Sequence, residues 1–233
     1  MKKIFITLAI AISLFHSVDA RVRGRVEAAP LYLHIGVVQS GQTTQRIDMY
    51  GGRLDATILP FEGYGVCLKP FGFGGWGNGS DIYSYGLGLG HYTPISDRIT
   101  LIPVVGVSRT HMETQLDVPA LALYNLSQRF RSYSFYVGGE AVYKLTPCFY
   151  VTGIYQYGWA NTKTLIDTPS PFEAFVPRVS RGESQGSNFA FVFDYYFKEC
   201  ISASLGIGYN NSLSKERHGI KGYGIKLGAA YTF

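Results

Sequence analysis

Long hydrophobic runs are missing from this 233-residue chain beyond its first fifteen residues. A helix that crosses a bilayer needs about 20 consecutive apolar residues, and no later segment supplies them. The lack of such a run excludes a bundle of transmembrane helices. Tyr, Phe and Gly are abundant, at 18, 15 and 28 residues, a mixture typical of aromatic-rich, closely packed β-strands.

The amino terminus has the pattern of an export signal. Two lysines precede the apolar stretch Ile4–Phe15, and small residues stand at positions 18 and 20, before a cleavage site. The stretch is too short for a membrane anchor. We expect cleavage after Ala20, a periplasmic segment over residues 21–29 and one barrel domain over residues 30–233.

Cysteine is scarce, and the three cysteines are Cys67, Cys148 and Cys200. Their spacings match no metal-binding knuckle, and an odd number leaves at least one thiol free or paired with another chain. Cys148 and Cys200 are expected two strand spacings apart, about 9.5 Å, which exceeds the roughly 7 Å that a disulfide allows. We therefore expect free thiols or bonds to other envelope proteins, and no metal or other cofactor.

The charge of the chain gives little sign of a nucleic-acid partner. The excess of basic residues is small, with a formal net charge of +5 for the whole sequence, and no basic cluster is interleaved with stacking aromatic residues. Nucleic acid is therefore not an expected partner. A mildly basic rim that faces anionic lipid headgroups accounts for the excess.

An alternation with a period of two runs through most of the chain. In residues 188–197 aromatic side chains hold the odd positions, whereas Asn188 and Asp194 fall on the even ones. A sheet with one lipid face and one lumen face requires this pattern. The same phase, with odd residues outward, continues through 82–92, 98–110, 132–145, 148–160, 200–210 and 219–233. We extend it to strand 30–40, where it would place Leu31, Leu33, Ile35 and Val37 against lipid.

The strands of a water-soluble β-sandwich would also alternate apolar and polar residues, so the position of charges decides between a sandwich and a transmembrane barrel. On the apolar face, charges appear only at strand ends, at Arg109, Arg131 and Lys221. A Lys or Arg at the bilayer midplane costs roughly 2 to 4 kcal/mol, against near zero to 1 at the interface. The sequence therefore predicts an all-β fold, a transmembrane antiparallel up-and-down β-barrel.

The number of strands depends on residues 41–80. Taken as one outer loop, this segment gives eight strands; as a hairpin with even residues outward, it gives ten, which we favour. A bulge would then be needed on each flank of the hairpin, and the pairs Gly51–Gly52 and Gly74–Gly75 could supply them. Pro103 falls inside a strand and predicts irregular pairing there. Short connections at 93–97, 146–147 and 198–199 are expected on the periplasmic side, and long ones at 111–131, 161–187 and 211–218 outside.

The last strand, residues 219–233, ends the chain on Phe233. It resembles the final strand of outer-membrane β-barrel families through Lys226, Gly228, Tyr231 and Phe233, and the size resembles small opacity-type and porin-like surface barrels. The resemblance implies a bacterial outer-membrane location, and it implies that the barrel assembly machinery reads this strand.

Few ionisable side chains are expected inside the barrel. They are His34, Glu140, Lys144, Asp194 and Lys226, with Arg98 at a strand end and Arg53, Asp55 and Lys69 if the extra hairpin spans. In a barrel of eight to ten strands side chains fill the interior, so we expect opposite charges to pair. Two alternatives stay open: a polar path for small solutes, since inward glycines leave room for water, and a proton or metal role for His34.

The outer rim carries polar residues in expected loops. Its acids and imidazoles are His111, Glu113, Asp117, Asp167, Glu183, Glu216 and His218, and no nucleophile, base and orienting acid stand at a recognisable spacing. We therefore expect no enzyme. The favoured function is a surface-exposed structural or interaction role; a narrow porin-like channel is the first alternative, and a lipid A-modifying enzyme or protease at the rim is the second.

Two features of the rim point to partners. Basic residues fall where lipopolysaccharide phosphates would sit, namely Arg109, Lys163, Arg178, Arg181, Lys215, Arg217 and Lys221. Residues 169–177 form an apolar, Pro-rich stretch that is suited to contact an envelope or host-surface protein. We therefore expect outer-membrane lipid and lipopolysaccharide as partners, together with such a protein.

Overall fold

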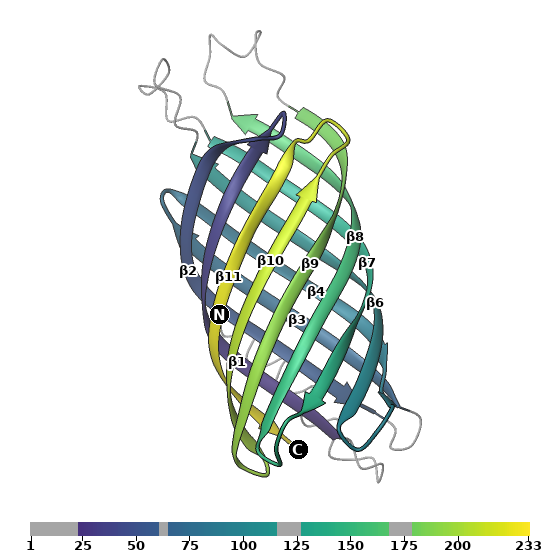
Figure 1. Cartoon of the computed structure of the whole chain (residues 1–233). Helices are drawn as coiled ribbons and strands as arrows, with labels where there is room; N and C mark the ends of the chain where they lie inside the picture. Colours follow the sequence, from purple (N-terminus) through teal and green to yellow (C-terminus); the bar gives the residue numbers. More distant parts are fainter. Residues whose placement is uncertain (1–22, 61–64, 116–126, 168–178) are drawn as a thin grey trace.

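The computed structural model describes residues 23–60, 65–115, 127–167 and 179–233, which form one antiparallel barrel (Figure 1). Its wall consists of β1 (Arg23–Gln39), β2 (Gln42–Leu59), β3 (Val66–Gly77), β4 (Ser80–His91), β6 (Ile99–Gln115), β7 (Ser127–Lys144), β8 (Phe149–Asp167), β9 (Val179–Lys198), β10 (Ile201–Leu213) and β11 (Gly219–Thr232). The two-residue β5 (Thr93–Pro94) only extends the pairing of β6. The all-β fold and the choice of ten strands over eight are confirmed.

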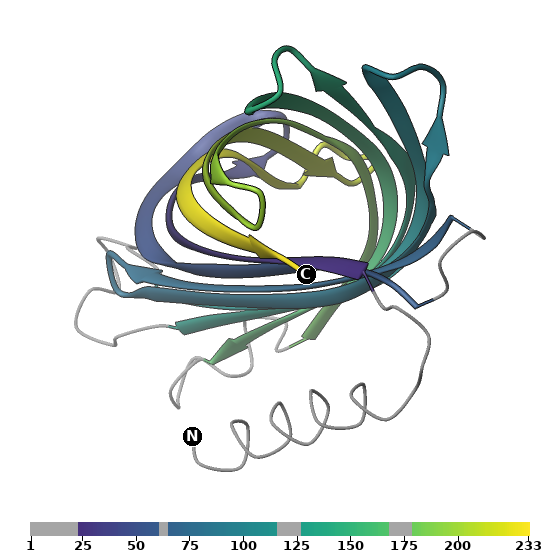
Figure 2. The same ribbon diagram turned by 90° about the horizontal axis from the view of Figure 1, so that it is seen from below.

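Two pairings close the sheet into a cylinder. β1 pairs with β2 on one side and with β11 on the other, and β4 pairs with β6. Figure 2 shows the resulting ring of strands from below. Within the described residues, no helix has the length and apolar character needed to cross a membrane. The predicted export signal, residues 1–20, lies outside the described part of the chain.

The two ends of the barrel differ in their connections. We call the end with the β7–β8 and β9–β10 turns and the carboxyl terminus the lower end, as it stands in Figure 1. The upper end holds the tight turns Ser40–Gly41 and Asn78–Gly79, where Ser40, Gly41, Asn78 and Gly79 all have positive φ, and the connection 214–218. Two of the upper connections are therefore as tight as the lower ones.

The outer surface of the barrel is apolar over most of its height. Phe191, Leu227 and Tyr133 are each more than half exposed, at 58%, 63% and 55%. Odd residues face outward in β4 and in β6 to β11, as the alternation predicted. Neighbouring rings contact one another along the surface, as with Phe135 and Trp159, whose centroids lie 6.0 Å apart.

The phase expected for β1 is wrong. Leu31 and Ile35 are 8% and 7% exposed and point into the barrel, and Leu33 and Val37 pack against the interior cluster that contains Ile35. The reason lies in the register shift between Val37 and Val38, which changes the β1–β2 pairing from odd with even, at Gln39 and Gln42, to odd with odd, as in Leu31 with Gly51. Odd residues of β1 therefore share the inward face of β2, and they oppose even residues of β11, such as Leu31 with Lys226.

The phase expected for β2 and β3 is right, but the expected bulges are absent from the described ladders. Gly51 pairs with Gly75 and Gly52 with Gly74 without a register shift. The inversion occurs at the two-residue turn between β3 and β4, which pairs even residues with odd ones. A register shift does occur in the β1–β2 ladder, between Val37 and Val38.

Several strands are longer than the sequence indicated. β1 begins at Arg23 and is paired on both sides, so at least residues 23–29 belong to the barrel wall rather than to a periplasmic segment. β6 reaches Gln115 and β7 starts at Ser127, and β8 and β9 likewise extend into the range expected as a loop, 161–187. In the extensions of β6 to β9 the outward positions are mostly polar or charged, so their sequence lacks the outward apolar residues that mark the rest of these strands.

The irregular pairing expected at Pro103 is confirmed. The β4–β6 ladder ends at the pair Gly90–Val104 and resumes as β5 at Thr93–Leu101. On its other side Pro103 keeps its register with Gly139 in β7. A proline lacks the N–H donor that one ladder hydrogen bond would need, so the interruption falls on one neighbour only.

Candidate functional site

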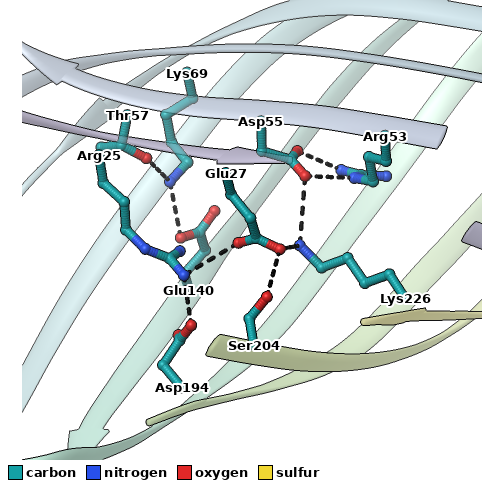
Figure 3. A network of polar contacts seen from close by, with 10 residues as sticks. All are labelled: Arg25, Glu27, Arg53, Asp55, Thr57, Lys69, Glu140, Asp194, Ser204 and Lys226. Atoms are coloured by element: carbon teal, nitrogen blue, oxygen red, sulfur yellow. Dashed lines mark hydrogen bonds and ion pairs between the residues drawn. The ribbon is translucent and has the colours of Figure 1, made fainter. Parts of the chain in front are cut away.

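Eight charged side chains meet inside the lower half of the barrel and form what we call the charged belt: Arg25, Glu27, Arg53, Asp55, Lys69, Glu140, Asp194 and Lys226 (Figure 3). Four are basic and four acidic, so their formal charges cancel. They come from β1, β2, β3, β7, β9 and β11. The belt therefore links strands from all round the wall.

Glu27 lies at the centre of the belt and is 2% exposed. Its Oε1 accepts hydrogen bonds from Lys226 Nζ and, at 2.8 Å, from Ser204 Oγ. Its Oε2 lies 3.1 Å from Arg25 Nη2. A buried carboxylate costs several kcal/mol unless it is paired and hydrogen-bonded, and three partners meet that need here.

Other pairs reach across to more distant strands. Arg25 Nη2 on β1 also donates to Asp194 on β9. Lys69 Nζ on β3 donates to Glu140 Oε2 on β7 and to Thr57 Oγ1, both at 3.0 Å. In Figure 3 these side chains lie between the walls rather than along one strand.

Arg53 and Asp55 complete the belt on β2. Arg53 donates twice to Asp55, at 2.6 and 2.7 Å, and Lys226 Nζ lies 3.4 Å from Asp55 Oδ2. The paired bonds hold the guanidinium in a fixed plane. Lys226 therefore bridges Glu27 and Asp55, which lie on neighbouring strands.

Inward glycines give space to large neighbours rather than to water. A Cβ on Gly106 would lie 2.4 Å from the Tyr136 ring, and one on Gly86 would lie 2.6 Å from Phe71. At Gly206 the same atom would meet the Lys226 side chain at 2.7 Å. The expectation that these glycines leave room for water is therefore wrong at these three positions.

Apolar side chains fill further parts of the interior. One buried cluster, Ile35, Ile47, Met49, Ile82 and Met112, lies near the upper turns. A second, Cys67, Ile102, Val104 and Tyr136, lies beside the belt. In these regions the lumen is packed like a protein core rather than lined like an open pore.

The structure brings most of the predicted lumen residues together. Glu140, Asp194 and Lys226 belong to the belt, as do Arg53, Asp55 and Lys69, the residues named for the extra hairpin. Lys144 lies instead near the lower end of β7, with its Nζ 5.9 Å from the centre of the Tyr150 ring. Arg98 is exposed in the connection before β6.

Sequence reasoning missed Arg25 and Glu27. Both fall in the segment expected to lie in the periplasm, yet they supply the centre of the belt. A signal was present, because Arg25 and Glu27 alternate with Val26 and Ala28 and continue the strand backwards. Pro30 obscured it, since proline is found mainly at strand edges and bulges.

His34 does not face the lumen. Its ring stacks on Tyr223 at 4.9 Å on the outer surface, and its Nδ1 lies 2.6 Å from Asp48 Oδ1. The Tyr32 hydroxyl donates to the same oxygen at 2.6 Å. His34 faces outward because the phase of β1 is inverted. A proton or metal role for His34 inside the barrel is therefore overturned. The described residues contain no group of three side chains arranged to hold a metal ion.

The cysteines differ in access. Cys67 is buried at 0% exposure, so the folded chain cannot bond it to another protein. Cys148 is exposed and Cys200 half-buried, both at the lower end, and all three are free. Cross-linking to envelope proteins therefore stays a prediction for Cys148 and Cys200 alone.

The carboxyl-terminal strand is joined to the first strand down to its last residue. Phe233 exchanges two backbone hydrogen bonds with Gly24, each 2.9 Å long. Tyr231 and Phe233 face outward with stacked rings 6.3 Å apart. A Cβ on Gly228 would lie 2.8 Å from Ser204 Oγ and 3.0 Å from Glu27 Oε1, so this glycine leaves space for the belt.

The described rim residues make separate local contacts. His111 stacks on Tyr83 at 4.8 Å, Glu113 pairs with Arg129 at 3.2 Å, and His218 lies 3.7 Å from Glu216. Asp117, Arg178 and the Pro-rich stretch 169–177 lie outside the described residues.

The comparisons with known proteins identify the fold. No family model and no curated protein matches the sequence. Among solved structures, the outer membrane protease OmpT from Escherichia coli aligns with a TM-score of 0.62 at 11% identity, over 94% of this chain and 100% of that one. The COG4313 outer membrane channel from Pseudomonas putida F1 gives 0.52 at 8% identity, over 93% and 97%. The translocator domain of autotransporter NalP from Neisseria meningitidis gives 0.50 at 12% identity, over 97% and 92%.

Proposed function

The chain has the fold of the outer-membrane β-barrel proteins, and we propose that it acts as a closed scaffold in the bacterial outer membrane, with its functional contacts on its surface. The observation that carries this proposal is the charged belt. Four positive and four negative side chains satisfy one another inside the barrel, as in a folded core, and they leave no net charge to select or attract an ion. The lower end, with its short β7–β8 and β9–β10 turns, would then face the periplasm and the upper end the cell exterior, because short turns of outer-membrane barrels are periplasmic.

Conductance in planar bilayers tests the proposal. The wild-type protein is expected to be silent, because Tyr136, Phe71 and Lys226 occupy the space beside the inward glycines. Reproducible openings of the size expected for a water-filled lumen would contradict it. A matched variant with Arg25, Glu27, Asp194 and Lys226 all replaced by Ser removes two charges of each sign, and it should conduct if the belt is the barrier.

A narrow channel is the second candidate, and one observation favours it. In the upper half of β8 to β10 most inward side chains are small or polar, and Asn188 donates to Gln156 at 3.0 Å while Asn210 remains exposed. These groups give water a polar surface to contact in the upper half. The same recording decides between the candidates. The proposal includes no catalytic role, and an unchanged lipid A mass spectrum in cells that express the protein is the expected result.

A further inference from the structure

Four basic side chains form one continuous row on the outside of the barrel. His111 on β6 pairs with Arg131 on β7, Arg131 pairs with Lys163 on β8, and Lys163 pairs with Arg181 on β9. Directly paired residues share a face of the sheet, and their Cβ atoms lie about 5 Å apart. We call these four residues the basic row.

Charges of one sign placed directly opposite each other destabilise a sheet, so a row of this kind needs compensation. In the part of the chain that the structure describes, no carboxylate makes an ion pair with Arg131, Lys163 or Arg181. Of the neighbouring acids, Glu113 holds Arg129 at 3.2 Å, and Glu183, two residues along β9 from Arg181, forms none of the ion pairs within the described residues. An external anion is therefore the natural partner of the row.

The height of the row identifies where that anion would be. On the same strands, four residues toward the lower end from Arg131 and Lys163, lie Phe135 and Trp159 with rings 6.0 Å apart. Exposed aromatic residues of this kind mark the membrane interface of a barrel. Four residues on a strand tilted near 40° rise about 10 Å along the barrel axis, which places the basic row at headgroup level.

Arg109 connects the aromatic and basic levels. Its guanidinium lies 4.9 Å from the centre of the Tyr133 ring and donates to the Tyr85 hydroxyl at 3.5 Å. A cation held on aromatic faces is suited to the boundary between hydrocarbon and water. Going toward the upper end, the outer surface of β6 to β9 therefore carries the aromatic rings of Phe135 and Trp159 first, then Arg109 against the Tyr133 ring, and then the basic row.

We infer that the basic row binds the phosphate groups of lipid headgroups in the outer leaflet. Arginine recognises phosphate through paired donors and lysine as a point charge, and both are present here on adjacent strands. The row lies on the outside of the barrel, so the inference does not depend on whether the lumen conducts.

Binding to lipid A tests the inference. The folded protein, in phosphatidylcholine nanodiscs, is titrated with lipid A that carries its phosphates and with the same lipid after enzymatic dephosphorylation. The wild type should prefer the phosphorylated form. The double variant R131Q/K163Q should bind it about 30-fold more weakly, since each basic residue near an anionic surface contributes about fivefold.

Arg46 supplies a matched control. It is also an exposed arginine on the outer face near the upper end, but on β2, where it pairs with Gly36. R46Q should leave the affinity for phosphorylated lipid A unchanged. An equal loss in R46Q would overturn the inference, because the attraction would then be a property of the whole rim.

Two further results would also overturn it. One is equal binding of the two forms of lipid A by the wild type. The other is binding of inorganic phosphate, or of a soluble polyanion such as heparin, that depends on Arg131 and Lys163 while lipid A binding does not. If the double variant fails to fold, as judged by its mobility on unheated gels, the single variants K163Q and R181Q decide the matter, each with an expected loss of about fivefold.

Discussion

Replacing Glu27 with alanine should severely destabilise the barrel. Glu27 is 2% exposed and neutralises Lys226 and Arg25, and it also accepts a bond from Ser204. Its loss leaves an excess of one buried positive charge, because the belt then holds four cations and three carboxylates. Removal of one partner of a buried ion pair costs about 3 to 5 kcal/mol, so E27A should lower the free energy of unfolding by that amount.

Urea unfolding of the protein in phospholipid vesicles, followed by tryptophan fluorescence, measures this loss. The control is E113A, since Glu113 also pairs with an arginine, at 3.2 Å, but its side chain is 36% exposed at the rim; it should cost about 0 to 1 kcal/mol. In E27Q/K226M both charges are removed together, and most of the stability lost in E27A should return. Equal losses in E27A and E113A would refute the reasoning, because the belt would then be hydrated like a surface.

Three other predictions follow from the same structure. F191R places a charge on the lipid face at a side chain that is 58% exposed, and it should cost about 2 to 4 kcal/mol in the same unfolding assay; a cost near zero would argue against contact with hydrocarbon. G106A should cost about 1 to 3 kcal/mol through overpacking, because its Cβ would lie 2.4 Å from Tyr136, whereas G52A, whose nearest atom is 3.9 Å away, should be nearly neutral. A membrane-impermeant maleimide should label Cys148 in the folded protein and reach Cys67 only after unfolding, as read by mass spectrometry; early labelling of Cys67 would contradict its burial.

The lipid-facing pattern was readable from sequence because it is local. In β9 the aromatic residues from Phe189 to Phe197 alternate within one strand, and beyond the register shift between Ile201 and Ser202 the ladder with β10 pairs odd residues with odd ones. Each strand joined by such a hairpin inherits the phase of its neighbour. The same reasoning correctly gave the inward face of Arg53 and Asp55.

The first strand could not be placed in this way. Its phase follows from the register shift between Val37 and Val38, beyond which odd residues of β1 pair with odd residues of β2, and the alternation in residues 30–40 gives no sign of that shift. The inward face predicted for His34 and the outward face predicted for Leu31 were both wrong for this one reason. The upper extensions of β6 to β9 were missed for another reason: their outward positions are mostly polar, as at Lys163 and Arg181, so the apolar alternation stops before the strands do.

The closing pairing has a consequence for how the barrel forms. Arg25 and Glu27 stand on the first strand, whereas Lys226 stands on the last strand and Asp194 two strands before it. Arg25 and Glu27 contact each other within β1, but until the two edges of the sheet meet Arg25 lacks Asp194 and Glu27 lacks Lys226. Formation of the β1–β11 pairing and of the ion pairs across it is therefore a single event, and a partly paired barrel gains little from either. Such coupling makes assembly all-or-none and disfavours opening of the finished wall along this pairing.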